Sequence, residues 1–127
     1  MTTDIGKLIA RLTFGATMLF AHGVPKLMAF STLQNSFPDP IGLGNSLSLG
    51  LAIFAEVACA LLLTLGLFTR WVCGPLFFTM LVAIVVVHGN DPWAKKELGF
   101  IYLAGYLICA LVGPGRLSLD FALRKKS

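Results

Sequence analysis

Apolar residues are grouped into four long stretches along this 127-residue chain, and shorter polar segments separate them. Each stretch approaches the roughly 20 residues that an α-helix needs to cross a membrane. The predicted helices cover residues 5–29, 46–67, 71–88, 98–113 and, as a short helix on the membrane surface, 118–125. We therefore expect an all-α protein in which residues 1–127 form a single domain, an antiparallel four-helix transmembrane bundle.

The first of these stretches is the weakest candidate for a membrane span, because Arg11, His22 and Lys26 interrupt it. A cleavable signal peptide is the competing interpretation of this segment. However, the residues from His22 to Lys26 lack the pattern of small residues that marks a cleavage site. A membrane-spanning helix is therefore the favoured interpretation.

The composition also indicates a membrane domain. Hydrophobic residues make up 57% of the chain and charged residues only 13%, and the mean hydropathy is +0.84. Ordinary globular domains contain about 25% charged residues. The polar segment 30–45 is predicted to cover the outer end of the bundle. The short link 66–71 forces the second and third helices to be antiparallel neighbours.

The distribution of basic residues predicts that both termini lie in the cytoplasm. With this orientation, seven of the ten lysines and arginines are on the inner side and three are on the outer side. The inner residues are Lys7, Arg11, Arg70, Arg116, Arg124, Lys125 and Lys126, and the outer residues are Lys26, Lys95 and Lys96. The net charge of +4 then indicates contact with anionic lipid headgroups. We expect no nucleic-acid partner, because no aromatic or groove-forming pattern accompanies the basic residues.

Glu56 is the only charged residue in the apolar run from Ile41 to Thr69. A carboxylate is costly in hydrocarbon, so it needs a buried partner, a proton or a water-filled cavity. Ala52, Cys59 and Ala60 share its helix face, and small residues allow a second helix to approach closely. Glu56 is therefore predicted to lie at a seam between helices.

The first helix carries a stripe of residues spaced by four, three, four and four positions: Arg11, Gly15, Met18, His22 and Lys26. This spacing places them on one helix face, and the ionisable members favour the bundle interior over lipid. In the predicted topology five ionisable residues converge on the outer half of the bundle: His22, Lys26, Glu56, His88 and Glu97. This convergence predicts a polar site inside the membrane.

Glu56 and His22 are the candidate catalytic residues of this site, because a buried carboxylate and an imidazole can exchange a proton. The candidate binding residues are Lys26, His88, Glu97, Tyr102 and Tyr106. Structural roles are the alternatives: Glu56 is satisfied by His22 or Lys26, His88 and Glu97 are solvated, and both tyrosines are core aromatics. We expect no metal site, because the histidines and glutamates lack the spacing of a ligand pair.

At the inner side, Arg70 and Asp120 are predicted to form an ion pair that holds the second and fourth helices together. Recruitment of a partner protein is the functional alternative for these two residues. The three cysteines, Cys59, Cys73 and Cys109, form no Cys-x-x-Cys pair. We expect them to be packing residues.

Several segments resemble one known family. They are His22-Gly23-Val24-Pro25-Lys26-Leu27, the membrane Glu56, Gly66-Leu67-Phe68-Thr69-Arg70, Glu97 with Tyr102 and Leu103, and Gly113-Pro114-Gly115-Arg116-Leu117-Ser118-Leu119-Asp120. Together they are similar to the DoxX family of small bacterial membrane proteins, from about Lys7 to Asp120. The resemblance implies a four-helix protein of the bacterial inner membrane. It also implies an association with membrane oxidoreductases, since relatives occur with thiosulfate:quinone oxidoreductases and in a mycobacterial oxidoreductase complex.

These observations lead to three hypotheses for the function. The first is a membrane subunit of a redox system that interacts with a quinone and a redox partner protein, not an enzyme on its own. The second is a protein that binds or conducts a small solute or lipid, which would need a homo-oligomer because four helices are few for a transporter. The third is a structural membrane scaffold, in which the polar residues set the helix register.

Overall fold

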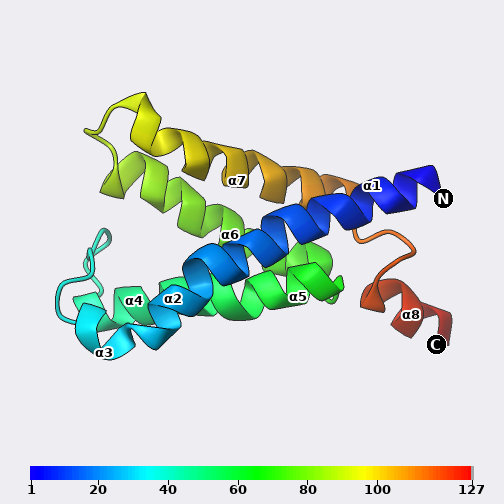
Figure 1. Cartoon of the computed structure of the whole chain (residues 1–127), viewed down its shortest axis with the longest axis horizontal. Helices are drawn as coiled ribbons and strands as arrows, with labels where there is room; N and C mark the ends of the chain where they lie inside the picture. Colours follow the sequence, from blue (N-terminus) through cyan, green and yellow to red (C-terminus); the bar gives the residue numbers. More distant parts are fainter. Residues whose placement is uncertain (127) are drawn as a thin grey trace.

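The computed structural model of this protein describes residues 1–126, and these residues are helical without a strand (Figure 1). The first helical stretch contains α1 (Thr2–Arg11), η1 (Leu12–Ala16), η2 (Leu19–Gly23) and α2 (Val24–Met28), followed by the short α3 (Phe30–Leu33). The second stretch contains α4 (Asn45–Ile53), η3 (Phe54–Cys59) and α5 (Ala60–Leu65). The third contains α6 (Thr69–Val82) and η4 (Ala83–Val87), and the last helices are α7 (Trp93–Val112) and α8 (Leu119–Lys126). The segments named η are π-helical.

The prediction of an all-helical chain is confirmed. Two of the long helices, Asn45–Leu65 and Thr69–Val87, are long and apolar enough to cross a membrane. The crossing of four helices, with both termini in the cytoplasm, stays a prediction. One boundary differs clearly from the sequence pattern, because α7 begins at Trp93 and not near residue 98. Pro92 precedes this helix in an extended conformation, and proline is well suited to a helix start because it lacks an N–H group.

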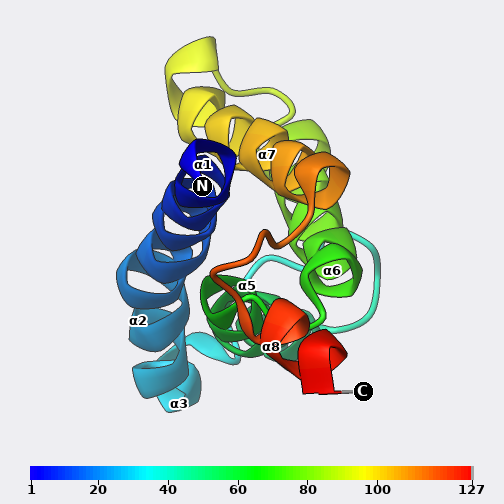
Figure 2. The same ribbon diagram turned by 90° about the vertical axis from the view of Figure 1, so that its right-hand side faces the viewer.

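The long helices pack along one another, and α6 and α7 form a hairpin beside the first helical stretch (Figures 1 and 2). Both chain ends lie at one end of the molecule, and the connections after α3 and after η4 lie at the other. Buried Leu63, Leu76, Met18 and Tyr106 are part of the core between the helices. The core therefore runs along the length of the helices.

Arg11 closes the core at the end that carries the termini. Its side chain is buried, with 1% of its surface exposed. The guanidinium donates hydrogen bonds to the carbonyl oxygens of Pro114 at 3.1 Å, Thr64 at 2.8 Å and Leu117. Arg11 thereby joins the first helical stretch to the end of α5 and to the segment that precedes α8.

Asp120 completes the turn between α5 and α6. Its carboxylate accepts hydrogen bonds from the backbone N–H groups of Phe68, at 2.8 Å, and Thr69, at 3.0 Å. Its own N–H donates to the carbonyl oxygen of Gly66 at 2.9 Å. Gly66 and Phe68 both have positive φ angles, 74° and 52°, in the left-handed region that non-glycine residues rarely adopt. The Asp120 contacts therefore stabilise a turn with an unfavourable backbone conformation.

The predicted ion pair between Arg70 and Asp120 is corrected by these contacts. Within residues 1–126, the carboxylate binds backbone N–H groups at the start of α6, and the Arg70 guanidinium donates to the carbonyl oxygen of Ala110 at 3.0 Å. The first N–H groups of a helix have no partner inside the helix, so they compete well for a nearby carboxylate. Arg70 and Asp120 still hold segments together at the same end, but through backbone groups.

Asp120→Ala is expected to reduce the free energy of unfolding by about 1–2 kcal/mol at neutral pH. Burial raises the pKa of Asp120, but the hydrogen bonds from Thr69 and Phe68 outweigh burial and hold this pKa below its usual value of 3.8. The stabilisation is therefore present above pH 3.8 and is lost as the pH falls through the lowered pKa. Denaturant titrations in mixed micelles at pH 7 and at pH 3 should show the difference between wild type and variant shrinking at the lower pH. Glu97→Ala, at an exposed position, is the control and should change little at either pH.

Candidate functional site

A buried ion pair joins the first two helical stretches. Lys26 Nζ lies 2.5 Å from Glu56 Oε1 and donates a hydrogen bond to it. The Glu56 side chain is only 2% exposed, and the Lys26 side chain is 27% exposed. Within residues 1–126, no hydrogen bond reaches the second carboxylate oxygen, Oε2. The pair therefore keeps one acceptor oxygen and two ammonium protons of Lys26 for a further partner.

Gly23 brings the two backbones together beside this pair. A Cβ atom at position 23 would lie 2.2 Å from the carbonyl oxygen of Glu56. Only a glycine permits this approach without a shift of one helix. Gly15 makes a similar approach further along, where a Cβ atom would lie 2.9 Å from the backbone nitrogen of Thr64. The small residues therefore set the spacing at which Lys26 reaches Glu56.

Both helices are π-helical where they meet. His22 belongs to η2 and Glu56 belongs to η3, and these two segments pack against each other. A π-helical turn holds more residues than an α-helical turn, so it changes the direction in which the following side chains point. Such turns are frequent at functional sites. Glu56 thus lies in a π-helical segment, and Lys26 follows another one directly in α2.

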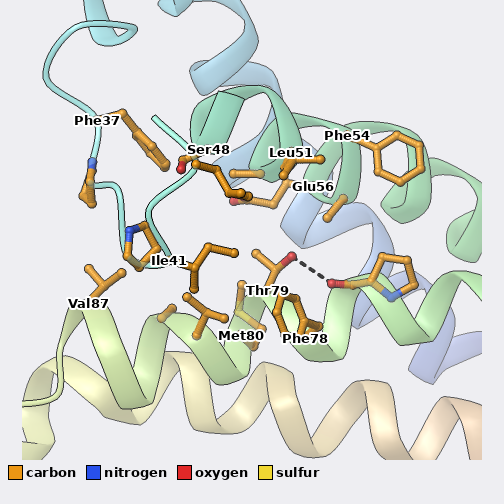
Figure 3. Close-up of a pocket in the computed structure, with 18 of the residues that line it drawn as sticks. Phe37, Ile41, Ser48, Leu51, Phe54, Glu56, Phe78, Thr79, Met80 and Val87 are labelled. Carbon is orange, nitrogen blue, oxygen red and sulfur yellow. Dashed lines mark hydrogen bonds between the residues drawn. The ribbon is translucent and has the colours of Figure 1, made fainter. Parts of the chain in front are cut away.

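A cavity of about 560 Å³ lies next to Glu56 (Figure 3). Its polar lining residues include Lys26, Glu56, Ser48 and His88, and most of the other lining residues are apolar. Figure 3 shows Glu56 on one wall, Thr79 and Met80 on the facing wall, and Phe37 and Ile41 from the connection before α4 beside them. A largely apolar cavity with a few polar groups at one place is typical of a small-molecule site.

A second, smaller cavity of about 200 Å³ lies on the other side of the pair. Lys26, Glu56, Met80, Ala83 and His88 line both cavities. The smaller cavity is also lined by His22, Lys95, Lys96 and Tyr102. The Lys26–Glu56 pair therefore forms part of the wall that the two cavities share.

Comparisons with known proteins agree with the resemblance seen in the sequence. The sequence profile of the DoxX family matches residues 6–89. The chain belongs to the DoxX family. The "Inner membrane protein YphA" of Escherichia coli (strain K12) is 32% identical over 125 residues, which cover 89% of this chain and 86% of that protein. An "Uncharacterized protein" of Haemophilus influenzae is 28% identical over 131 residues, which cover 97% of this chain and 86% of that protein.

No solved structure gives a significant match to this DoxX-family chain. The inner membrane relative, the family match and the apolar helices together show that the protein is a multi-pass protein of the bacterial inner membrane. The family profile covers Glu56 and its partners on the first helical stretch. It ends before α7, so the resemblance noted between Gly113 and Asp120 lies outside the matched residues.

The structure of this DoxX protein brings together four of the five predicted ionisable residues. His22, Lys26, Glu56 and His88 line the smaller cavity, whereas Glu97 is exposed and lines neither cavity. The His88 Nδ1 atom lies 2.8 Å from Asp91 Oδ2, in the turn that follows η4. Glu97 lies in the second turn of α7, because this helix starts earlier than predicted.

The two tyrosines have different environments. Tyr102 lines the smaller cavity, and the ring of His22 meets its ring edge-on with centroids 5.7 Å apart. Tyr106 is fully buried, lines neither cavity, and its hydroxyl donates a hydrogen bond to the carbonyl oxygen of Phe14 at 3.0 Å. Tyr102 can therefore contact a ligand, whereas Tyr106 is a core residue, as its structural alternative proposed.

Sequence reasoning missed several residues of the site in this DoxX protein. Lys95 and Lys96 were predicted only to be basic residues on the outer side of the membrane, although both line the smaller cavity. Their position at the start of α7, shortly after His88 in the sequence, is the signal that could have placed them near the site. Met80 lines both cavities, but an apolar residue within an apolar helix gives no such signal.

Proposed function

We propose that this protein is a membrane subunit of a redox system and that it binds a quinone in the larger cavity. The observation that carries the proposal is the buried Lys26–Glu56 pair at the wall of a largely apolar cavity of about 560 Å³. A quinone has an apolar tail and a ring with polar oxygens, so its two parts fit the two kinds of lining. Membership of the DoxX family supports the membrane setting.

The polar pair is suited to both oxidation states of a quinone. The free Lys26 protons can donate to a quinone carbonyl oxygen, and Glu56 Oε2 can accept from a quinol hydroxyl. Oxidation of a quinol releases two protons and two electrons. Glu56 would receive one hydroxyl proton, the other would pass to water at the mouth of the cavity, and both electrons would pass to a redox partner protein. The pair is already in place in a water-poor cavity, so little reorganisation is needed for this transfer.

The proposed topology has four membrane crossings and cytoplasmic termini. The larger cavity would then open towards the outer half of the membrane, beneath the segment between α3 and α4. The basic-residue distribution supports this orientation, because seven of the ten lysines and arginines fall on the terminal side. His22 would assist proton exchange from its place between Tyr102 and the smaller cavity.

Binding of decylubiquinone to the purified protein in nanodiscs is the direct test. Leu51→Trp should abolish binding, because Leu51 lines the larger cavity and an indole would fill part of it. Glu56→Gln should weaken binding of the reduced form, decylubiquinol, by about tenfold in the same assay, because a hydrogen bond to a charged acceptor is replaced by one to a neutral acceptor. Isothermal titration calorimetry would measure both effects.

Leu61→Trp is the matched control, because Leu61 is exposed on the same helical stretch and lines neither cavity. It should bind decylubiquinone as the wild type does. Equal binding by wild type and Leu51→Trp would contradict the proposed site. Retention of a phospholipid that decylubiquinone does not displace would favour the alternative function of lipid binding.

A further inference from the structure

The smaller cavity carries more positive than negative charge. Three lysines line it, Lys26, Lys95 and Lys96, against one carboxylate, that of Glu56. Glu56 is already paired with Lys26, so within this lining no carboxylate is left to neutralise the other two lysines. The remaining ionisable lining residues, His22, His88 and Tyr102, include no further carboxylate. The cavity is therefore suited to an anion and not to a cation.

The contacts of the two remaining lysines leave their charges available. Lys96 Nζ donates to the carbonyl oxygen of Gly89 at 3.0 Å, which orients the ammonium but does not neutralise it. Within residues 1–126, no ion pair involves Lys95 or Lys96. The nearby Asp91 carboxylate is bound by His88 and interacts with both lysines only at longer range, without lining the cavity. Lys95 is exposed and Lys96 is half-buried, so both ammonium groups are accessible to an anion that enters the cavity.

The start of α7 adds to the positive potential. Lys95 and Lys96 lie in the first turn of this 20-residue helix, whose N-terminus carries the positive end of the helix dipole. Trp93, also in this turn, is exposed and packs against Phe100 with ring centroids 5.4 Å apart. Exposed tryptophans are typical of the depth at which lipid headgroups lie. A phosphate group is therefore the anion that this position would meet most often.

We propose that the smaller cavity is a binding site for a phosphate group, held by Lys95 and Lys96 with Lys26 at its inner wall. A volume of about 200 Å³ equals roughly six water molecules, which gives space for a phosphate group. The phosphate belongs either to an anionic lipid headgroup or to free phosphate, because both present the same oxygens to the lysines. Lys26 lines both cavities, but Lys95 and Lys96 line only the smaller one, so substitutions at these two residues test phosphate binding separately from quinone binding.

The test compares phosphate sources in nanodiscs made of phosphatidylcholine. Inorganic phosphate is titrated into the wild-type protein at constant ionic strength, and binding is followed by calorimetry. In a second arm, phosphatidylglycerol replaces part of the lipid, and native mass spectrometry counts the lipids that remain bound. The Lys95→Gln/Lys96→Gln variant should lose about tenfold in affinity for the phosphate source that binds.

Lys7→Gln/Arg116→Gln is the control, because it removes the same amount of charge from residues that line neither cavity: Lys7 lies in α1, and the Arg116 N–H donates to Asp4 of the same helix. This variant should bind like the wild type. Binding of inorganic phosphate would assign the site to free phosphate, and retention of phosphatidylglycerol alone would assign it to a lipid headgroup. The proposal is overturned if the wild type binds neither source, or if both double variants lose affinity equally.

Discussion

Arg11→Ala is expected to lower the free energy of unfolding by about 4 kcal/mol, the largest effect we expect from a single substitution in this chain. The change leaves the carbonyl oxygens of Thr64, Pro114 and Leu117 without the guanidinium that now donates to them. It also leaves a cavity where a buried side chain was. Unfolding in mixed micelles with increasing dodecyl sulfate, followed by tryptophan fluorescence, would measure the loss.

Two further variants separate the geometry of Arg11 from its charge. Arg11→Lys keeps the charge but lacks the planar group that reaches three separate oxygens. It should therefore lower the free energy of unfolding, but by less than Arg11→Ala does. Arg116→Ala, at an exposed residue near the same end, should have little effect. If Arg11→Ala and Arg116→Ala were equally stable, the carbonyl contacts would not hold this end together.

Lys26→Met is expected to destabilise the protein by about 3 kcal/mol, because it leaves the Glu56 carboxylate buried without its partner. Methionine keeps much of the apolar volume of the lysine stem, so the loss reports mainly on the charge. The same dodecyl sulfate titration would measure it. Removal of one member of a buried pair is typically far more destabilising than replacement of both.

The double variant Lys26→Met/Glu56→Gln tests that explanation. It removes both charges and should recover most of the stability that Lys26→Met loses. A coupling energy of about 1–3 kcal/mol is expected from the cycle of single and double variants. Additive losses, with no coupling, would mean that the contact between Lys26 and Glu56 contributes nothing beyond the separate side chains.

The stripe on the first helix shows how much of the site could be predicted from the sequence. Arg11, Gly15 and Met18 are buried, and Lys26 contacts Glu56. This agrees with the prediction that the stripe faces the interior of the bundle. Four turns of a regular α-helix advance the chain by about 14 positions, whereas Arg11 and Lys26 are fifteen positions apart. The π-helical segments η1 and η2 supply wider turns within this stretch. Lys26 and Glu56 could be predicted as site residues because a charged residue within an apolar stretch is unusual and needs a buried partner.

Contacts made through the backbone could not be predicted in the same way. Arg11, Arg70 and Asp120 all bind carbonyl or N–H groups, and the sequence does not show which backbone groups a turn leaves free. The opposite charges of Arg70 and Asp120 therefore predicted an ion pair, although both side chains bind backbone groups. The same limit applies to Tyr106. Its hydroxyl donates to the carbonyl oxygen of Phe14, and no side-chain pattern reveals this backbone partner, so the sequence also allowed a contact with a ligand.

The contacts of Asp120 have a consequence for how the protein is made. The turn from Gly66 to Thr69 receives its hydrogen bonds from a residue about fifty positions later in the chain. A ribosome adds residues in order, and earlier segments begin to fold first. The turn of the α5–α6 hairpin therefore cannot gain these hydrogen bonds until Asp120 has been synthesised, so we expect the hairpin to acquire its final stability after it enters the lipid.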